Sequence, residues 1–273
     1  MDLIKLNNFK FNKKYGQNFI FDNNLLTAIV NDSGVTKKDE VLEIGPGAGT
    51  LTKIIANKAK KVVSYEIDEN LKPILKENLK DIENCEVIFK DALKEDIIQI
   101  EQNFEDKYLV IANLPYYITT PLIFKFIEQT SRVKSITVMV QKEVAERLVA
   151  KPNSKDYGII TVMLDFYGTT KIVRQVDRKM FIPSPNVDSS VVKIELVPNK
   201  FDCDSKLFTK IVHSAFSMRR KTILNNLSSG LNLSKEDLTC VLNACDIDPQ
   251  KRAENLSTME YVKLTNSLSK KLN

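Results

Sequence analysis

Short apolar segments alternate with amphipathic segments through the first two-thirds of the 273-residue chain. Apolar runs bounded by polar residues predict buried strands, and the stretches between them, such as 50–60 and 69–79, carry apolar residues at helical spacing. This alternation predicts an α/β fold in which helices cover a parallel sheet. The expected strands are 41–45, 62–66, 86–91, 108–113 and 135–141.

The pattern changes in the last third of the chain. Two more strand-like segments, 169–176 and 187–196, are joined through a link that carries two prolines, and we expect them to form an antiparallel edge. After Pro198 the spacing is helical throughout, and Ser234 and Ser257 each precede acidic residues, as at helix N-termini. We therefore expect two domains, residues 1–197 with the sheet and residues 198–273 all helical.

Composition narrows the class of protein. No apolar run approaches the roughly 20 residues of a membrane span, and the first residues lack the apolar core of a secretory signal, so we expect a cytoplasmic protein. With His213 as the single histidine and no CxxC spacing, neither a metal centre nor a Ser-His-Asp triad is expected. The cysteines are Cys85, Cys203, Cys240 and Cys245, which we expect to be reduced.

Charge is uneven along the chain. The net charge is +5, and residues 198–273 alone hold 12 Lys and Arg against 8 Asp and Glu. A basic C-terminal segment suggests a polyanionic partner, with nucleic acid as the first candidate. A solvated helical surface explains the same counts equally well.

Three of the eight glycines fall in the segment EIGPGAG, residues 43–49, between an expected strand and an expected helix. Glycine lets a backbone approach a ligand closely and adopt positive φ. The spacing GxGxG departs from the dinucleotide pattern GxGxxG. It is similar to the cofactor loop of Rossmann-like S-adenosylmethionine methyltransferases, with a tight turn in another α/β protein as the alternative.

Two carboxylates follow at the ends of the next strands. Glu66 ends the second expected strand, where a carboxylate can accept hydrogen bonds from both ribose hydroxyls. Asp91 ends the third, where it can accept from an adenine amino group. Together with the glycine loop, they predict a ligand that carries adenosine, and an acidic pocket suits a cationic sulfonium.

Asn113 ends the fourth expected strand and opens the segment NLPY. Its side-chain oxygen and the Leu114 carbonyl can accept the two N–H groups of an adenine amine and direct its lone pair. Pro115 stiffens the loop, Tyr116 offers a stacking face, and Phe181 is a candidate for a second wall around an unpaired base. Such catalysis works by positioning and desolvation, without a strong base. A structural turn is the alternative for this loop, and an ordinary core position is the alternative for Phe181.

Six segments resemble one family in their order along the chain. They are KKYGQNFIFD, EIGPGAGTLT, NLPYYITTP, FIPSPNVDSSV, AFSMRRKTILNNL and KRAENLS. The family is that of the bacterial small-subunit (16S) ribosomal RNA adenine dimethyltransferases of the KsgA/RsmA type. Tyr15 and Met218 stand where the family commonly has Leu and Gln.

This resemblance implies a Rossmann-like class I methyltransferase sheet, with helices on both faces, in residues 1–197. Residues 198–273 would be a helical domain that binds RNA or the ribosome. The implied reaction is N6,N6-dimethylation of two adjacent adenosines near the rRNA 3′ end in immature small subunits. S-adenosylmethionine would be the donor and S-adenosylhomocysteine the product, with no metal and with a monomeric enzyme.

The resemblance also implies the site residues. The cofactor site would comprise Asn18, Ile20, Gly45, Glu66, Asp91 and Asn113. The target adenine would be held by Asn113, Leu114, Tyr116 and Phe181. The densest basic triplet would contact RNA phosphates and comprises Arg219, Arg220 and Lys221.

Two rival functions stay open. The large-subunit adenine dimethyltransferases that confer macrolide resistance share the glycine loop and the NLPY chemistry. A non-catalytic ribosome-assembly factor could retain the fold, but loss of Asn113 or of the glycine loop would mark it, and neither is lost.

Overall fold

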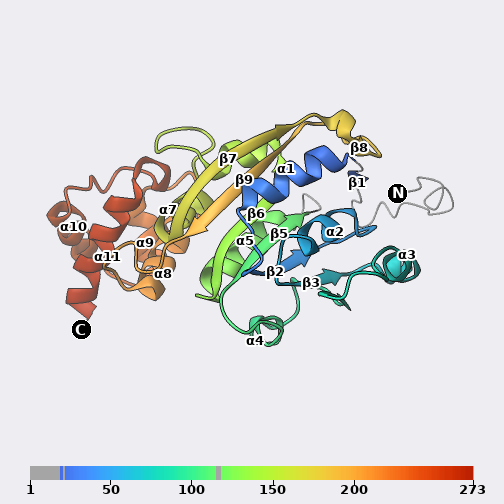
Figure 1. The fold of residues 1–273 in the computed structure, drawn as a ribbon. Coiled ribbons are helices and arrows are strands. Elements are labelled where there is room, and N and C mark those ends of the chain that lie inside the picture. Colours follow the sequence, from blue (N-terminus) through green and yellow to red (C-terminus); the bar gives the residue numbers. More distant parts are fainter. Residues whose placement is uncertain (1–18, 21, 115–117, 273) are drawn as a thin grey trace. The chain divides into compact units, whose positions relative to one another are not determined.

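The computed structural model describes residues 19–20, 22–114 and 118–272 (Figure 1). The chain forms two compact units. The first takes in the described residues up to Lys142 together with Ile172–Lys193, and the second takes in Glu143–Lys171 and the chain from Ile194 onward. The assignment of methyl transfer to residues 1–197 and of RNA binding to residues 198–273 stays a prediction.

A seven-stranded sheet runs through the fold. Its order is β4 (Cys85–Phe89), β3 (Lys61–Glu66), β2 (Glu40–Ile44), β5 (Tyr108–Asn113), β6 (Val133–Gln141), β9 (Ser189–Leu196) and β7 (Gly168–Val176). The pairs β2–β3, β2–β5, β3–β4 and β5–β6 are parallel. All five strands expected in the first two-thirds are present, each within two residues of its expected bounds.

The two later strands lie at one end of this order, with β7 at the edge. Figure 1 shows the arrows of β7 and β9 pointing in opposite directions, as expected for an antiparallel edge. A separate two-stranded ribbon joins β1 (Phe19–Ile20) to β8 (Phe181–Ile182). This ribbon pairs residues about 160 positions apart and was not expected from the sequence.

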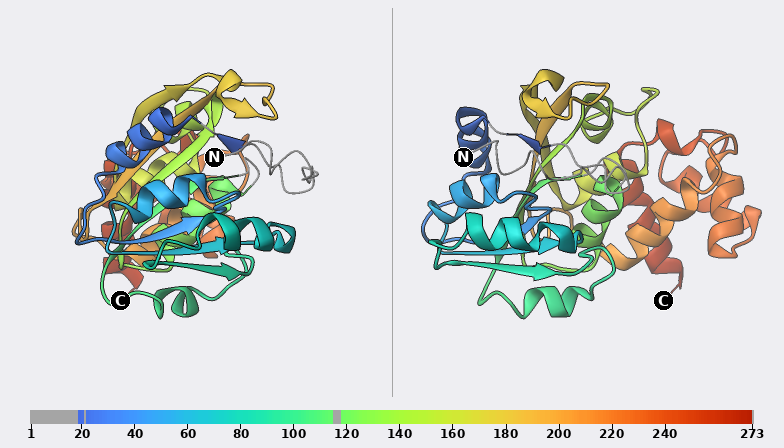
Figure 2. Two further views of the ribbon diagram at one scale, coloured as in Figure 1. Left: turned by 45° about the vertical axis from the view of Figure 1, so that its right-hand side comes forward. Right: turned by 90° about the vertical axis from the view of Figure 1, so that its right-hand side faces the viewer.

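Helices flank both faces of the sheet (Figures 1 and 2), as predicted. In the first unit they are α1 (Asn23–Ser33), α2 (Thr50–Ala56), η3 (Glu69–Leu71), α3 (Lys72–Asn78), α4 (Ile97–Glu101) and α5 (Thr119–Glu128). One core cluster packs Leu26, Ile29 and Val30 of α1 and Ile55 of α2 against strand residues such as Val41. These contacts bury the apolar stripe of each helix, which is the main source of helix stability in proteins.

The second unit is helical apart from its strand ends. Its elements are α6 (Lys142–Leu148), α7 (Ile159–Tyr167), α8 (Ser205–Ala215), α9 (Ile223–Leu231), α10 (Lys235–Ala244), η5 (Ala253–Asn255) and α11 (Thr258–Leu272). The rings of Phe166 and Phe208 stack in its core with centroids 3.7 Å apart.

Both expected helix caps in the second unit are present. Ser234 Oγ accepts from the Asp237 N–H at 3.0 Å, and Ser257 and Glu260 exchange hydrogen bonds in the reciprocal arrangement of a capping box. No helix among the described residues is long and apolar enough to cross a membrane.

Candidate active site

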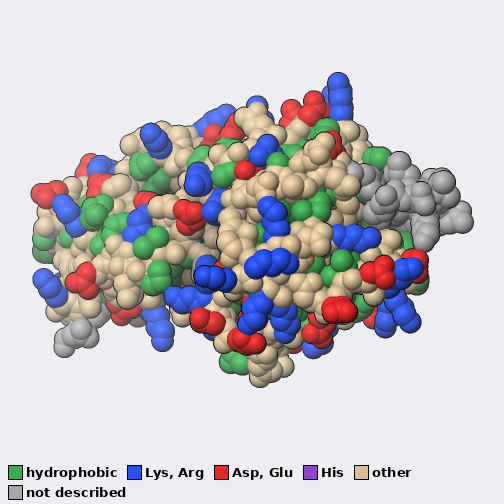
Figure 3. Space-filling model, viewed as in Figure 1, with side chains coloured by type: hydrophobic (Ala, Val, Ile, Leu, Met, Phe, Trp, Pro, Cys, Tyr) green, Lys and Arg blue, Asp and Glu red, His purple; other side chains and the backbone are tan. Residues whose placement is uncertain are grey.

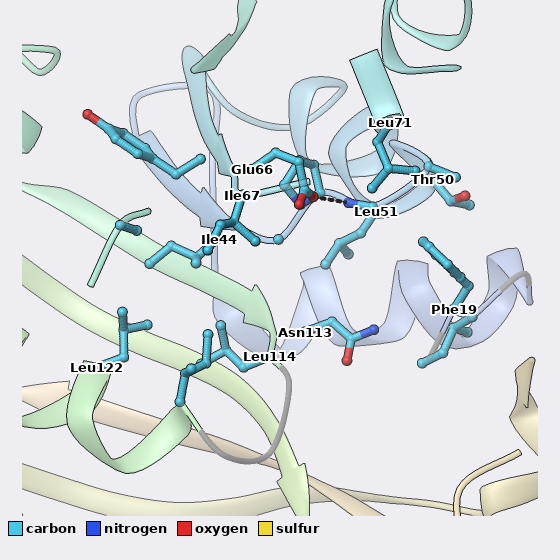
Figure 4. A pocket seen from close by; sticks show the side chains of 18 of the residues that line it. Phe19, Ile44, Thr50, Leu51, Glu66, Ile67, Leu71, Asn113, Leu114 and Leu122 are labelled. Carbon is cyan, nitrogen blue, oxygen red and sulfur yellow. Dashed lines mark hydrogen bonds between the residues drawn. The ribbon is translucent and has the colours of Figure 1, made fainter. Parts of the chain in front are cut away.

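The first unit contains a cavity of about 200 Å³ where β2, β3 and β5 end at their carboxyl ends (Figure 4). Ligands of open α/β sheets bind at this edge. Seven of the predicted site residues line the cavity: Ile20, Gly45, Glu66, Asp91, Asn113, Leu114 and Phe181. Asn18 and Tyr116 lie outside the described residues.

The glycine loop forms one wall of the cavity and needs glycine at its centre. Gly47 has φ +57°, and a β-carbon on it would lie 2.5 Å from Phe19 Cε1. The Phe19 ring packs with Ala48, Leu71 and Leu75, so it cannot give way without disturbing this cluster. Gly47 is therefore required both by its backbone conformation and by the close approach of a buried ring.

Glu66 is fixed at the end of β3. The residue is 5% exposed. Its Oε2 accepts from the Gly47 N–H at 3.2 Å (Figure 4), and its Oε1 accepts from the Asp68 N–H at 2.9 Å. Burial raises the pKa of Glu66, and these backbone hydrogen bonds oppose that rise. Each oxygen keeps further acceptor capacity, so the group can accept hydrogen bonds from a polar ligand in the cavity.

Glu43 lies in β2, two residues before Gly45, and is not among the residues that line the cavity. It is fully buried, and Oε2 accepts from Ser64 Oγ at 2.7 Å. Burial raises the pKa of Glu43 to about 7, and the neighbouring charge of Glu66 adds to this rise. Its hydrogen bond joins β2 to β3 behind the cavity lining, so we assign Glu43 a structural role.

Asp91 lies in the turn after β4, which ends at Phe89, so the expectation that it ends the strand is wrong by two residues. Its Oδ1 accepts from the Leu93 N–H at 3.0 Å. Asp91, Ala92 and Leu93 all border the cavity. Although Asp91 lies two residues beyond the end of β4, it still borders the cavity.

Asn113 is the last residue of β5, as expected, and Leu114 after it is buried. Figure 4 shows the Asn113 amide directed to the side of the cavity on which Phe19 lies. Ile118 and Leu122, from the start of α5, line the cavity beyond it. The polar end of β5 therefore faces a wall that is mostly apolar.

The ribbon of β1 and β8 brings Ile20 opposite Phe181 in antiparallel register. Phe181 is 3% exposed, borders the cavity and also packs in the core cluster with Ile20 and Met139. It is thus a core aromatic that forms part of the cavity wall.

Sequence reasoning missed some of the apolar lining. Ile67 follows Glu66 directly, borders the cavity and is 43% exposed, which is high for a large apolar side chain. Leu71, from η3, also lines the cavity. An apolar residue directly after a strand-end carboxylate is the signal that could have identified Ile67.

The basic triplet belongs to the second unit and lies between α8 and α9. Arg219 donates to the Lys155 carbonyl at 3.1 Å, and its Nε lies 3.4 Å from Glu254 Oε2. Arg220 and Lys221 are exposed, and no ion pair joins them to another described residue. The Arg219 side chain thus has partners within the second unit, at Lys155 and Glu254, whereas the side chains of Arg220 and Lys221 are exposed.

The turn that carries the triplet is held from below. The buried Asn226 amide donates to the carbonyls of Ala215, at 2.6 Å, and Met218, at 3.0 Å. Figure 3 shows Lys and Arg side chains interspersed with Asp and Glu on the face in view. Because basic and acidic side chains are mixed on that face, their distribution does not mark a basic RNA-binding patch there.

Comparison with known proteins places this chain among enzymes that act on ribosomal RNA. Residues 8–270 match the family model described as ribosomal RNA adenine dimethylase. A "Ribosomal RNA small subunit methyltransferase A" from Clostridium botulinum is 45% identical over 269 residues, which cover 98% of this chain and 97% of that protein.

Two solved structures are similar over most of the chain. A dimethyladenosine transferase from Plasmodium falciparum has a TM-score of 0.80 at 28% identity, covering 93% of this chain and 98% of that one. The 23S rRNA methyltransferase ErmE has a TM-score of 0.69 at 24% identity, covering 92% of this chain and 99% of that one, and shows likeness of fold alone. The expected methyltransferase fold is confirmed, and the chain belongs to the ribosomal RNA adenine dimethylase family.

Proposed function

We propose that this protein dimethylates N6 of two adjacent adenosines near the 3′ end of small-subunit rRNA. The observation that carries this proposal is the 45% identity, over nearly the full length of both chains, to a protein named as a small-subunit rRNA methyltransferase. The immature small subunit in the cytoplasm is the proposed substrate particle, and the enzyme acts as a monomer.

S-adenosylmethionine is the proposed methyl donor. The cavity fits it because the loop requires a glycine at position 47 and the Glu66 carboxylate is buried but has acceptor capacity left. Glu66 would hold the ribose hydroxyls, Asp91 the adenine amino group, and Ile20, Gly45 and Asn113 other parts of the molecule. When bound, the donor supplies an electrophilic methyl group on a sulfonium. Asn18 would complete this set.

The target adenine enters the cavity at the end of β5. The amine of adenine is a weak nucleophile because its lone pair is delocalised into the ring. Asn113 Oδ1 and the Leu114 carbonyl would accept its two N–H groups and aim the lone pair, while Tyr116 and Phe181 would bound the ring. Catalysis then depends on positioning and on exclusion of water, and the excess proton leaves to solvent after transfer.

RNA is proposed to bind the second unit at Arg219, Arg220 and Lys221. Arg220 and Lys221 are exposed on a turn that Asn226 holds in place. Phosphate contacts of this kind fix register and orientation, and they make affinity depend on salt.

Incubation with labelled S-adenosylmethionine tests the proposed substrate. Unmethylated small and large subunits are offered separately, and the modified bases are mapped. Label on two adjacent adenosines near the small-subunit rRNA 3′ end is expected. Label on large-subunit rRNA would support the macrolide-resistance type instead, and label on neither would support a non-catalytic assembly factor.

The Asn113→Ala variant tests the proposed site. We expect methylation to fall by at least about a hundredfold, by analogy with removal of one positioned hydrogen-bonding group from an active site, while affinity for small subunits is largely kept. The matched control is Asn243→Ala, which removes an exposed amide in the second unit and should leave both unchanged. Near-normal turnover in Asn113→Ala would refute the site.

A further inference from the structure

Lys125 on α5 is the only buried lysine or arginine in the part of the chain that the structure describes, with 7% of its surface exposed. A buried ammonium is costly unless hydrogen bonds and opposite charges compensate it. The buried ammonium of Lys125 must therefore be compensated by specific interactions, which an exposed lysine does not need.

The ammonium donates to three backbone carbonyls of one short segment. Its Nζ lies 3.0 Å from the carbonyl oxygen of Ala92, 3.2 Å from that of Leu93, and within hydrogen-bonding distance of that of Glu95. Three N–H donors are the full capacity of a lysine ammonium. The segment after β4 is thus held by a single side chain that comes from another element.

Charges around this contact favour the ammonium. Burial lowers the pKa of Lys125, and the negative charges of the nearby Asp96, Glu95 and Asp91 carboxylates oppose that lowering. Each of these carboxylates also has a partner of its own. Asp91 accepts from the Leu93 N–H at 3.0 Å, Glu95 pairs with Lys90 at 2.8 Å, and Asp96 accepts from the Ile98 N–H at 2.8 Å.

Both elements joined by Lys125 form walls of the cavity. Asp91, Ala92 and Leu93 line it from the segment after β4. Leu122, which is three residues before Lys125 and so on the same face of α5, lines the cavity from that helix. Lys125 itself does not border the cavity, so any influence on the ligand passes through these walls.

We propose that Lys125 is a positioning residue for methyl-donor binding, which fixes the segment 91–95 to α5 and so sets the place of the Asp91 carboxylate. This inference rests on the proposed function, in which Asp91 accepts from the donor's adenine. It predicts that loss of the ammonium weakens donor binding and leaves the methyl-transfer step at saturation nearly unchanged.

The test measures the binding of S-adenosylhomocysteine to the full chain by calorimetry, together with the steady-state constants for S-adenosylmethionine. Lys125→Met keeps a long side chain but removes all three donors, and we expect Kd and KM to rise about tenfold or more, in line with loss of hydrogen bonds to a charged group. The kcat at saturating donor should stay within about threefold. The control is Lys60→Met, which removes a half-exposed lysine paired with Glu105 and should change neither constant.

Two further measurements separate positioning from general stability. Lys125→Gln keeps two N–H donors, and its loss of affinity should be intermediate; it also serves if Lys125→Met does not fold. In the variants, amide hydrogen exchange should become faster in residues 91–96 than in wild type, while exchange elsewhere in the first unit changes less. Unchanged S-adenosylhomocysteine affinity in a folded variant, or a fall in kcat with affinity intact, would overturn the proposal.

Asp91→Asn distinguishes this inference from the proposed function on which it rests. If Asp91→Asn leaves donor affinity unchanged, the proposed cofactor site is wrong. If Asp91→Asn weakens binding and Lys125→Met does not, the site stands and only the role of Lys125 fails. If Lys125 acts through Asp91, the two substitutions together should weaken binding by less than the product of their separate effects.

Discussion

Gly47→Ala is the substitution whose effect can best be worked out from the structure. A β-carbon at this position would lie 2.5 Å from Phe19 Cε1 and 3.0 Å from Cδ1, and the backbone has φ +57°. A residue with a β-carbon pays about 1–2 kcal/mol for this left-handed conformation. Moving the Phe19 ring out of its cluster costs up to about 1.5–3 kcal/mol of apolar burial. We therefore expect the free energy of unfolding to fall by about 2.5–5 kcal/mol.

The same substitution should weaken donor binding. The Gly47 N–H is one of the donors that fix the Glu66 carboxylate, and a shift of the loop releases it. We expect the affinity for S-adenosylhomocysteine to fall at least about tenfold, in line with the loss of one charge-assisted hydrogen bond. Urea unfolding and calorimetric titration measure the two effects separately.

Two further variants show whether the clash with Phe19 is the cause. Phe19→Leu in the Gly47→Ala background removes the ring edge and should recover part of the lost stability and affinity. Gly158→Ala is the control, because no atom lies within 4 Å of its added β-carbon and its φ is negative; its cost should stay within about 1 kcal/mol. Wild-type stability and affinity in Gly47→Ala would refute the reasoning.

Two more predictions concern buried polar groups. The pKa of Glu43 is raised by burial from 4.5 to about 7, so the folded state binds the proton more tightly and stability falls as pH rises between these values, by up to about 3 kcal/mol. In urea unfolding from pH 5 to 8, Glu43→Gln should therefore gain stability relative to wild type as pH rises to 7, and a constant difference would contradict the assignment. Asn226→Ala removes the buried amide that donates to the Ala215 and Met218 carbonyls, and among the described residues the Met218 carbonyl keeps only the Lys221 N–H. The substitution should cost about 1–3 kcal/mol and lower small-subunit affinity in a binding assay without changing S-adenosylhomocysteine affinity, and unchanged small-subunit affinity in a folded variant would count against the role of the 219–221 turn.

Most of the first unit could be predicted because its strands are buried on both faces. Such strands appear as continuous apolar runs, and their carboxyl ends meet at one edge of the sheet. Glu66 and Asn113 end β3 and β5, as the pattern indicated. Asp91 was displaced by two residues because β4 is only partly buried, so the apolar pattern does not mark its end clearly.

Other features of the site have no local signature. The ribbon of β1 and β8 is two residues long on each side, and its register is set by packing rather than by a sequence period. Lys125 lies in the helical sequence TTPLIFKFIE, where a lysine would ordinarily be expected at the surface. Its partners are backbone carbonyls about 30 residues earlier. Because every residue has a backbone carbonyl, the sequence does not indicate these partners.

The ribbon also joins the two halves of the cavity. Phe19 packs against Gly47 on the proposed cofactor side, and the next residue, Ile20, pairs with Phe181 on the proposed target side. Because the two residues are adjacent in one short strand, displacement of Phe19 moves the partner of Phe181 as well. A change in the glycine loop can therefore displace Phe181, which would hold the adenine, through Phe19 and Ile20 rather than through the strands of the main sheet. If Gly47→Ala only weakened donor binding, saturating donor would restore its turnover. Because the substitution also disturbs the wall at Phe181, we expect turnover at saturating donor to stay below that of the wild type.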